Sequence, residues 1–246
     1  GRRDALWSPP RTPSRHEKTP AMLTFHFHHT PNPMKIALFL AESGIEHELV
    51  PVDTFRGEQH TEAFLAINPN AKLPAIEDDG RRVFDSTAIL LYLADKHGVL
   101  TGDPAERGEL LSWLMFVASG LGPYSGQSVH FNTFGKDKDA AGYASKRYLR
   151  EAERHYSVME RHLAGREFFV GDSFTIADIS AWGWVDRASR VLGEGRLAEF
   201  PEVKRWFDGI DARPAVRTAR SMGEDIDFKR DFDEETARAL FPSSFD

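Results

Sequence analysis

The chain has 246 residues and a formal net charge of -7. This acidic balance argues against nucleic acid as the main partner. The sequence holds no cysteine, which excludes a disulfide, a cysteine nucleophile and a CxxC redox pair within this chain. It has no apolar run of membrane-spanning length and no secretory signal pattern, so we expect a cytoplasmic location and no membrane partner.

The first 21 residues differ in composition from the rest of the chain. They hold four prolines and more basic than acidic residues, without helical or strand periodicity. A segment of this kind buries little apolar surface. We therefore expect a flexible leader over residues 1–21, ahead of a folded chain that starts at Met22.

Residues 22–100 alternate between strand and helix patterns. Asn32 is predicted to cap a first helix, with Pro33 at the first helical position and Gly44 at the end. Asp78-Asp79-Gly80 between apolar runs predicts a hairpin. The full set of expected elements is strands at 23–28, 47–52 and on either side of the hairpin, and helices at 32–44, 62–67 and 86–97. This order combines a parallel with an antiparallel strand pair and predicts an α/β domain of the thioredoxin-like type.

The strongest local signals lie between Asn70 and Leu93. Proline at Leu73-Pro74 removes a ladder donor from a strand edge, and a cis bond there would aim the backbone of Leu73 at a peptide-like ligand. Ser86 is predicted to cap the next helix, whose free N–H groups form an anion site beside the Asp85 carboxylate. This combination suits the carboxylate and ammonium groups at the end of an amino acid. On Ser86 alone, an ordinary capped helix is the favoured interpretation.

Residues 105–220 are predicted to form an all-helical domain, with helices at 106–121, 143–163, 175–191 and 203–212. Thr175 and Asp178 form a capping box, which we interpret as a folding signal only. Residues 221–246 form an acidic C-terminal extension with phenylalanines among the charges. Aromatic residues at such intervals can anchor a polar segment against the body, but the sequence indicates no role for it.

Three of the ten histidines, His26, His28 and His29, invite a metal interpretation. In an alternating strand, His26 and His28 share one face and Phe25 and Phe27 share the other. We favour solvated or packed histidines over ligands and predict no metal site.

Three motifs together resemble a known family: TPNPMKIALFLAE from Thr30, NAKLPAI from Asn70 and GLGPYSGQSVHFN from Gly120. They are similar to the cytosolic glutathione transferases, and most closely to the bacterial Nu class, over nearly all of residues 23–215. The resemblance implies a thioredoxin-like domain followed by an all-helical domain, glutathione as cosubstrate, and a homodimer. Nu-class members act as glutathione-dependent disulfide-bond oxidoreductases without a protein cysteine, and they bind oxidised glutathione or two glutathiones per subunit.

The resemblance also assigns roles to residues. Thr30 and Asn32 would contact the glutathione sulfur as the catalytic pair. The remaining glutathione contacts would come from Gln59 and Lys72 at the glycyl end, Leu73 with Pro74 at the cysteinyl unit, Asp85 with Ser86 at the γ-glutamyl end, and Arg154 from the same or the neighbouring subunit. Gln59 and Lys72 are also compatible with plain surface residues, for Gln59 equally so, and Arg154 is compatible with an i,i+4 charge network.

Two features depart from the family pattern. Asp85 replaces the more common glutamate, which keeps the charge and shortens the reach, and Pro33 stands where a smaller residue is expected. The segment 127–135 is predicted to interrupt a helical region, and we interpret Gln127, His130, Phe131 and Asn132 as a candidate site for the acceptor or a second glutathione.

The first hypothesis for function is thiol–disulfide exchange, in which bound glutathione thiolate attacks a small disulfide and the protein contributes positioning and electrostatics. The first alternative is conjugation of glutathione to a small electrophile, which uses the same thiolate. The second is a glutathione-binding or interaction module without catalysis.

Overall fold

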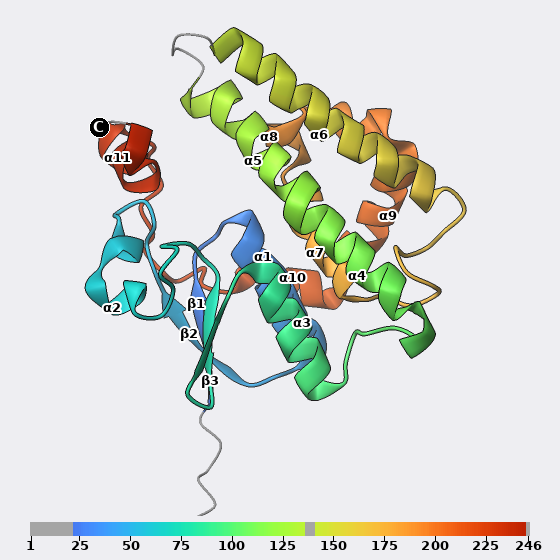
Figure 1. Ribbon diagram of the computed structural model, residues 1–246, viewed down its shortest axis with the longest axis horizontal. Helices are drawn as coiled ribbons and strands as arrows, with labels where there is room; N and C mark the ends of the chain where they lie inside the picture. Colours follow the sequence, from blue (N-terminus) through green and yellow to red (C-terminus); the bar gives the residue numbers. More distant parts are fainter. Residues whose placement is uncertain (1–21, 136–140, 245–246) are drawn as a thin grey trace, which may run out of the picture.

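The computed structural model describes residues 22–135 and 141–244, so the expected leader over residues 1–21 lies outside the described residues. The first half holds a four-stranded mixed sheet of order β2-β1-β3-β4. Its strands are β1 (Leu23–Phe27), β2 (His47–Pro51), β3 (Ala75–Asp78) and β4 (Arg81–Phe84). β1 pairs in parallel with β2 and antiparallel with β3, and β3 pairs antiparallel with β4. The predicted thioredoxin-like fold is confirmed (Figure 1).

The helices of this half are α1 (Pro31–Ser43), α2 (Glu62–Leu65) and α3 (Ser86–His97). The predicted start of the first helix was wrong: Thr30 is the N-cap and Pro31 occupies the first turn. Both Pro31 and Pro33 tolerate this placement because the first-turn N–H groups have no partner within the helix. The predicted cap of α3 was also wrong, because Asp85 is the N-cap and Ser86 is the first helical residue.

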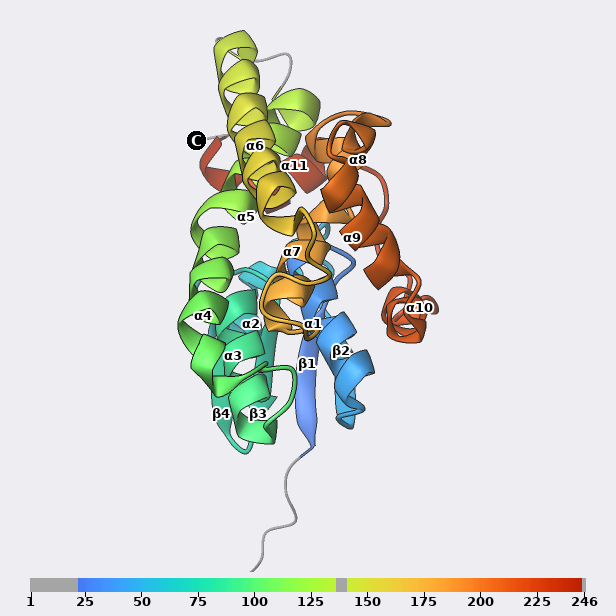
Figure 2. The same cartoon turned by 90° about the vertical axis from the view of Figure 1, so that its right-hand side faces the viewer.

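The second half of the described chain is helical, and the predicted all-helical fold is confirmed (Figure 2). Its α-helices are α4 (Arg107–Phe116), α5 (Gly122–Val129), α6 (Ala141–Leu163), α7 (Ile176–Val185), α8 (Ala188–Val191), α9 (Pro201–Asp211), α10 (Pro214–Ser221) and α11 (Glu234–Leu240). Two π-helical turns, Val117–Leu121 and His130–Phe134, follow α4 and α5. Two predicted helices are therefore divided: 106–121 ends in a π-turn, and 175–191 breaks between α7 and α8.

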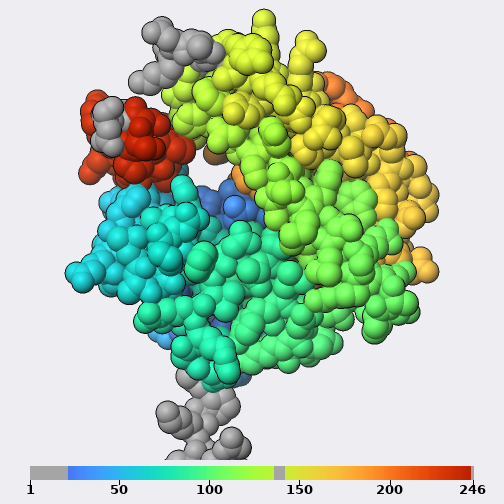
Figure 3. Space-filling model, viewed as in Figure 1, coloured from blue at the N-terminus to red at the C-terminus, as the bar shows by residue number. Residues whose placement is uncertain are grey.

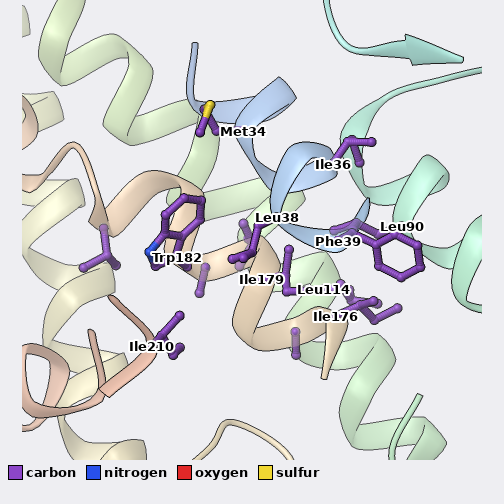
Figure 4. Close-up of a cluster of buried hydrophobic side chains, with 14 of the residues drawn as sticks. Met34, Ile36, Leu38, Phe39, Leu90, Leu114, Ile176, Ile179, Trp182 and Ile210 are labelled. Carbon is purple, nitrogen blue, oxygen red and sulfur yellow. The ribbon is translucent and has the colours of Figure 1, made fainter. Parts of the chain in front are cut away.

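The main hydrophobic core lies where α1 meets α7 (Figure 4). Met34, Leu38 and Phe39 of α1 pack in one cluster with Ile179 and Trp182 of α7. The two helices approach closely because Gly183 has no side chain: an added Cβ there would lie 2.6 Å from Cγ of Lys35 and 2.8 Å from the carbonyl oxygen of Pro31. Helix α1 is thus held between the sheet and the helical half, and its N-terminus is fixed in position.

The C-terminal tail, residues 223–244, returns to the thioredoxin-like half (Figure 1). Its helix α11 lies beside the segment that contains α2, far in sequence from it. Phe228 packs against the rings of Phe27, His28 and His29. In the described residues, no helix is long and apolar enough to cross a membrane.

Candidate functional site

A pocket of about 670 Å³ lies between the thioredoxin-like half and the helical half, and Figure 3 shows the hollow beside the tail. This volume falls in the range of about 300–1,000 Å³ that is typical of small-molecule sites. Asn32, Lys35, Lys72, Asp85, Ser86 and Thr87 line it from the first half, and Gln127, His130, Phe131, Phe134 and Trp184 are among the residues that line it from the second. Phe241 and Ser244 of the tail also line it.

The N-terminus of α3 forms one side of the pocket. The Oδ1 atom of Asp85 accepts hydrogen bonds from the backbone N–H of Thr87 at 2.8 Å and of Ala88 at 3.2 Å. Asp85 has φ 72° and ψ 127°, a conformation that side chains rarely adopt. Such strain is retained when the surroundings demand it, and it frequently accompanies function. Here it leaves an exposed carboxylate next to the buried Ser86 hydroxyl at the positive end of a helix dipole.

Lys35 lies within the same pocket and was not predicted from the sequence. Its side chain is only 2% exposed, and its Nζ atom donates to the Ser86 Oγ atom at 3.4 Å. Burial lowers the pKa of Lys35 to about 7, while the nearby Asp85 carboxylate opposes this shift. The Lys35 ammonium group therefore lies beside the N-terminus of α3.

The predicted catalytic pair lies at the N-terminus of α1. Asn32 is in the first turn and lines the pocket. Thr30 is half-buried at the N-cap position, its hydroxyl makes no capping hydrogen bond, and it does not line the pocket. The carbonyl oxygen of Thr30 accepts from the N–H of Met34 at 3.2 Å. The start of α1 therefore directs N–H groups and a helix dipole toward this region.

Leu73-Pro74 lies directly before β3, at the start of a strand, as expected from the proline. The Leu73-Pro74 bond is cis. Within the described chain, no hydrogen bond involves the backbone of Leu73, so its N–H and C=O groups remain unpaired. Lys72 is exposed and lines the pocket, and its carbonyl oxygen accepts from the side-chain amide of Asn68 at 2.6 Å.

Three of the four residues predicted to form the acceptor or second glutathione site line the pocket. Gln127, His130 and Phe131 line the pocket, whereas Asn132 does not. The Asn132 side chain instead donates to Ser128 and accepts from Ser145. The predicted interruption of the helix was wrong, because the chain stays helical through the π-turn His130–Phe134. Such turns recur at functional sites because the extra residue redirects neighbouring side chains.

Four predicted glutathione ligands do not line the pocket: Leu73 and Pro74, which follow the lining residue Lys72 in sequence, and Gln59 and Arg154, which lie elsewhere. Gln59 is 3% exposed and donates through Nε2 to the carbonyl oxygens of Thr54 and Ala239, so the tail covers it. Arg154 is exposed on α6 and pairs with Glu151 at 3.0 Å. The described chain therefore brings Asn32, Lys72, Asp85 and Ser86 together, but it does not bring Gln59 or Arg154 to them.

The histidines near β1 have protein partners. His26 lies 3.3 Å from the Glu77 carboxylate, and His28 lies 3.6 Å from that of Asp53. Burial lowers the pKa of His28 to about 4, despite the opposing effect of Asp53. Among the described residues, no group of three potential ligands is arranged to hold a metal ion.

The chain combines a thioredoxin-like half with a helical half and has a pocket at the N-termini of α1 and α3. This is the arrangement of the glutathione transferase fold, and comparison with known proteins gives the same family. Family models described as Glutathione S-transferase, N-terminal domain, and Glutathione S-transferase, C-terminal domain, match residues 29–96 and 142–209. The chain is 40% identical over 206 residues to the disulfide-bond oxidoreductase YfcG of Escherichia coli (strain K12), an alignment that covers 80% of this chain and 94% of that protein. The chain belongs to the glutathione S-transferase superfamily.

Solved structures in this superfamily contain ligands. The chain is similar to a glutathione transferase family member from Pseudomonas fluorescens pf-5 with two glutathione bound, with a TM-score of 0.75 and 37% identity, covering 80% of this chain and 92% of that one. It is also similar to a glutathione transferase from Pseudomonas putida with one glutathione disulfide bound per subunit. The TM-score is 0.74 at 34% identity, and the match covers 84% of this chain and 93% of that one.

Proposed function

We propose that this chain binds glutathione in the pocket and uses its thiolate to reduce small disulfides. The observation that carries the proposal is the combination of a pocket at two helix N-termini with a chain that has no cysteine. The similarity to a disulfide-bond oxidoreductase supports the choice of reaction. Every reacting sulfur must then come from small molecules, and the protein supplies positions and charges.

Each site residue has a role in this proposal. Asp85 and Ser86 hold the γ-glutamyl end, the unpaired backbone of Leu73 pairs with the cysteinyl unit, and Lys72 approaches the glycyl carboxylate. These placements direct the thiol toward Asn32 and the Thr30 hydroxyl at the start of α1. Donors and a helix dipole at this point lower the pKa of the thiol and favour the thiolate.

The reaction balances with glutathione alone as reductant. A glutathione thiolate attacks one sulfur of the substrate disulfide, a new S–S bond forms, and the other sulfur leaves as a thiolate that takes up a proton. A second glutathione thiolate attacks the glutathione sulfur of this mixed disulfide and releases the second substrate thiol. Two glutathiones are oxidised to glutathione disulfide as one substrate disulfide is reduced to two thiols.

The alternative reaction is conjugation to a small electrophile, which the apolar lining from Phe131, Phe134 and Trp184 favours. One purified sample distinguishes the two at the same glutathione concentration, by comparing reduction of a small model disulfide with conjugation of a model aryl halide. Dominant disulfide reduction supports the proposal. Dominant conjugation keeps the glutathione site and changes the reaction, and binding without either activity indicates a binding module.

Two sets of variants test the residue roles. Thr30→Ala with Asn32→Ala should lower kcat far more than glutathione affinity, because these residues act on the developing thiolate; equal losses would contradict the assignment. Ser86→Ala should weaken glutathione binding. Ser112→Ala is a matched control, since the Ser112 hydroxyl is exposed on α4 and donates only to the carbonyl oxygen of Gly108.

We also propose a homodimer and a cytoplasmic location, as in the family that the sequence resembles. Leu111 and Met115 on α4 and Phe84 on β4 are apolar and exposed by 37%, 46% and 39%, which suits a surface covered by a second copy.

A further inference from the structure

The C-terminal tail connects the two halves of the molecule beside the pocket. It starts after α10, follows the thioredoxin-like half and ends next to the π-turn His130–Phe134 of the helical half. Figure 3 shows the tail in red, seated against the cyan part of the first half and touching the yellow-green part of the second.

The tail is attached to the thioredoxin-like half by polar and aromatic contacts. The backbone N–H of Lys229 donates to the buried Asp53 carboxylate at 2.7 Å. Gln59 Nε2 donates to the carbonyl oxygen of Ala239 at 3.0 Å, and the His60 ring lies 2.8 Å from the same oxygen. These contacts fix backbone atoms of the tail at two separate points, 10 residues apart in sequence (229 and 239).

Aromatic rings attach the same segment to the helical half. Phe232 stacks on Phe134 with ring centroids 3.8 Å apart and an interplanar angle of 20°. Phe241 lies edge-on to His130 at 4.6 Å and tilted against Phe134 at 5.8 Å. Phe134, His130 and Phe241 all line the pocket, so this cluster is part of its surface.

We propose that Phe232 and Phe241 of the tail determine the size of the disulfide that the pocket accepts, so that small disulfides are reduced and disulfides on folded proteins are excluded. The proposal rests on the proposed function. The tail contacts both halves of the molecule. Phe241 lies on the pocket surface, and Phe232 stacks on the lining residue Phe134. A disulfide on a folded protein must bring its bulk past these rings, whereas two small thiols joined by a disulfide fit within the cavity.

The geometry of thiol–disulfide exchange explains why limited space at the tail would restrict the size of the acceptor disulfide. Exchange requires the thiolate to reach a disulfide sulfur while the leaving sulfur departs on the far side of it, so both substituents of the disulfide need space. The tail rings limit this space from the side of the helical half, where they pack against His130 and Phe134. Removal of these rings should therefore change substrate selection and leave glutathione binding in place.

The test compares two acceptors with the full-length protein: a small model disulfide, and a small folded protein that carries glutathione on one surface cysteine. The variants are Phe241→Ala alone and Phe232→Ala with Phe241→Ala. We expect the wild type to prefer the small disulfide strongly in kcat/KM, and the double variant to reduce that preference by roughly tenfold, since each ring contact contributes modestly. The affinity for S-methylglutathione should stay within about twofold.

Two control variants separate loss of the rings from loss of a tail or an aromatic residue in general. Asp227→Ala changes a fully exposed tail side chain, at 101%, that makes only a long ion pair with Arg56. Tyr143→Ala removes an aromatic ring that is 78% exposed on α6. Both should retain the wild-type preference, and thermal unfolding checks that every variant is folded.

A binding measurement decides the proposal independently of activity. The wild type should bind S-methylglutathione and reject the glutathionylated protein, and the double variant should bind both. If the wild type reduces or binds the protein-linked form as well as the small one, or if the tail variants leave the preference unchanged, the proposal is wrong. If no form of the protein reduces any disulfide, the proposed reaction is wrong, and the binding preference still decides the role of the tail.

Discussion

The ammonium group of Lys35 donates to the hydroxyl of Ser86 over 3.4 Å, inside a pocket that leaves only 2% of Lys35 exposed. A buried ammonium loses its hydration, so the pKa of Lys35 falls to about 7. A ligand carboxylate at the N-terminus of α3 would supply a favourable partner for the charged form. We therefore expect Lys35 to couple ligand binding to the uptake of a proton.

We predict that Lys35 takes up a fraction of a proton when S-methylglutathione binds just above pH 7. This ligand has no thiol to ionise, so its sulfur does not contribute to the uptake. The sign follows from the pKa: free Lys35 is partly neutral there, and the bound carboxylate raises its pKa and recharges it. Calorimetry in buffers of different ionisation enthalpy measures the uptake. Lys35→Met should abolish it and weaken binding, whereas Lys72→Met should weaken binding and leave the uptake in place. Equal uptake in the wild type and Lys35→Met would contradict this role.

The close approach of α7 to α1 gives a second prediction. An added Cβ at Gly183 would overlap the side chain of Lys35 and the backbone of Pro31, so Gly183→Ala must shift α1. Overpacking of this kind costs about 1–3 kcal/mol in the free energy of unfolding. The same variant should weaken glutathione binding, because Lys35 and Asn32 move with α1.

A matched control for that variant lies on α9. Gly209 has nothing within 4 Å of an added Cβ, so Gly209→Ala should leave ligand affinity unchanged and raise stability by roughly 0.5–1 kcal/mol through its helix propensity. Chemical denaturation of the two variants tests both effects. Similar changes in both would show that contact with α1 is not the cause.

Local signals in the sequence predicted the elements that depend on neighbouring residues. The hairpin between β3 and β4 turns at Asp79 and Gly80, both with positive φ, as Asp-Gly in a tight turn requires. The strands, the hairpin and most helices follow from such signals. The positions of helix starts were less certain, because Pro31 and Pro33 both suit a first turn.

The missed parts of the site depend on residues far apart in sequence. Lys35 sits among Ile36, Leu38 and Phe39, and its burial requires the absence of a side chain at Gly183 in another helix. The tail phenylalanines reach the pocket by packing against His130 and Phe134, and no local sequence pattern predicts these contacts. The π-turn that holds these two residues also has no sequence signal of its own.

The capping box at the start of α7 has a larger role than a cap alone. The Asp178 carboxylate accepts from the N–H groups of Phe169 and Thr175, from the Thr175 hydroxyl, and from the Trp206 indole at 2.9 Å. Asp178→Ala leaves these buried donors unpaired and should reduce the free energy of unfolding by roughly 2–4 kcal/mol. Denaturant unfolding measures this loss, and a loss below about 1 kcal/mol would show that water replaces the carboxylate.

The exposed residues of α4 give the last prediction, on assembly. Leu111 and Met115 are four residues apart and so share one face of α4, and Figure 2 shows α4 and β4 on the same side of the molecule. If a second copy covers this face, Met115→Glu buries an unpaired charge there and should convert a dimer to a monomer. Light scattering and sedimentation measure the mass directly. Tyr143→Glu places the same charge on an exposed part of α6 and should leave the dimer intact. A wild-type monomer, or a dimer that Met115→Glu does not weaken, would place the interface elsewhere or exclude it.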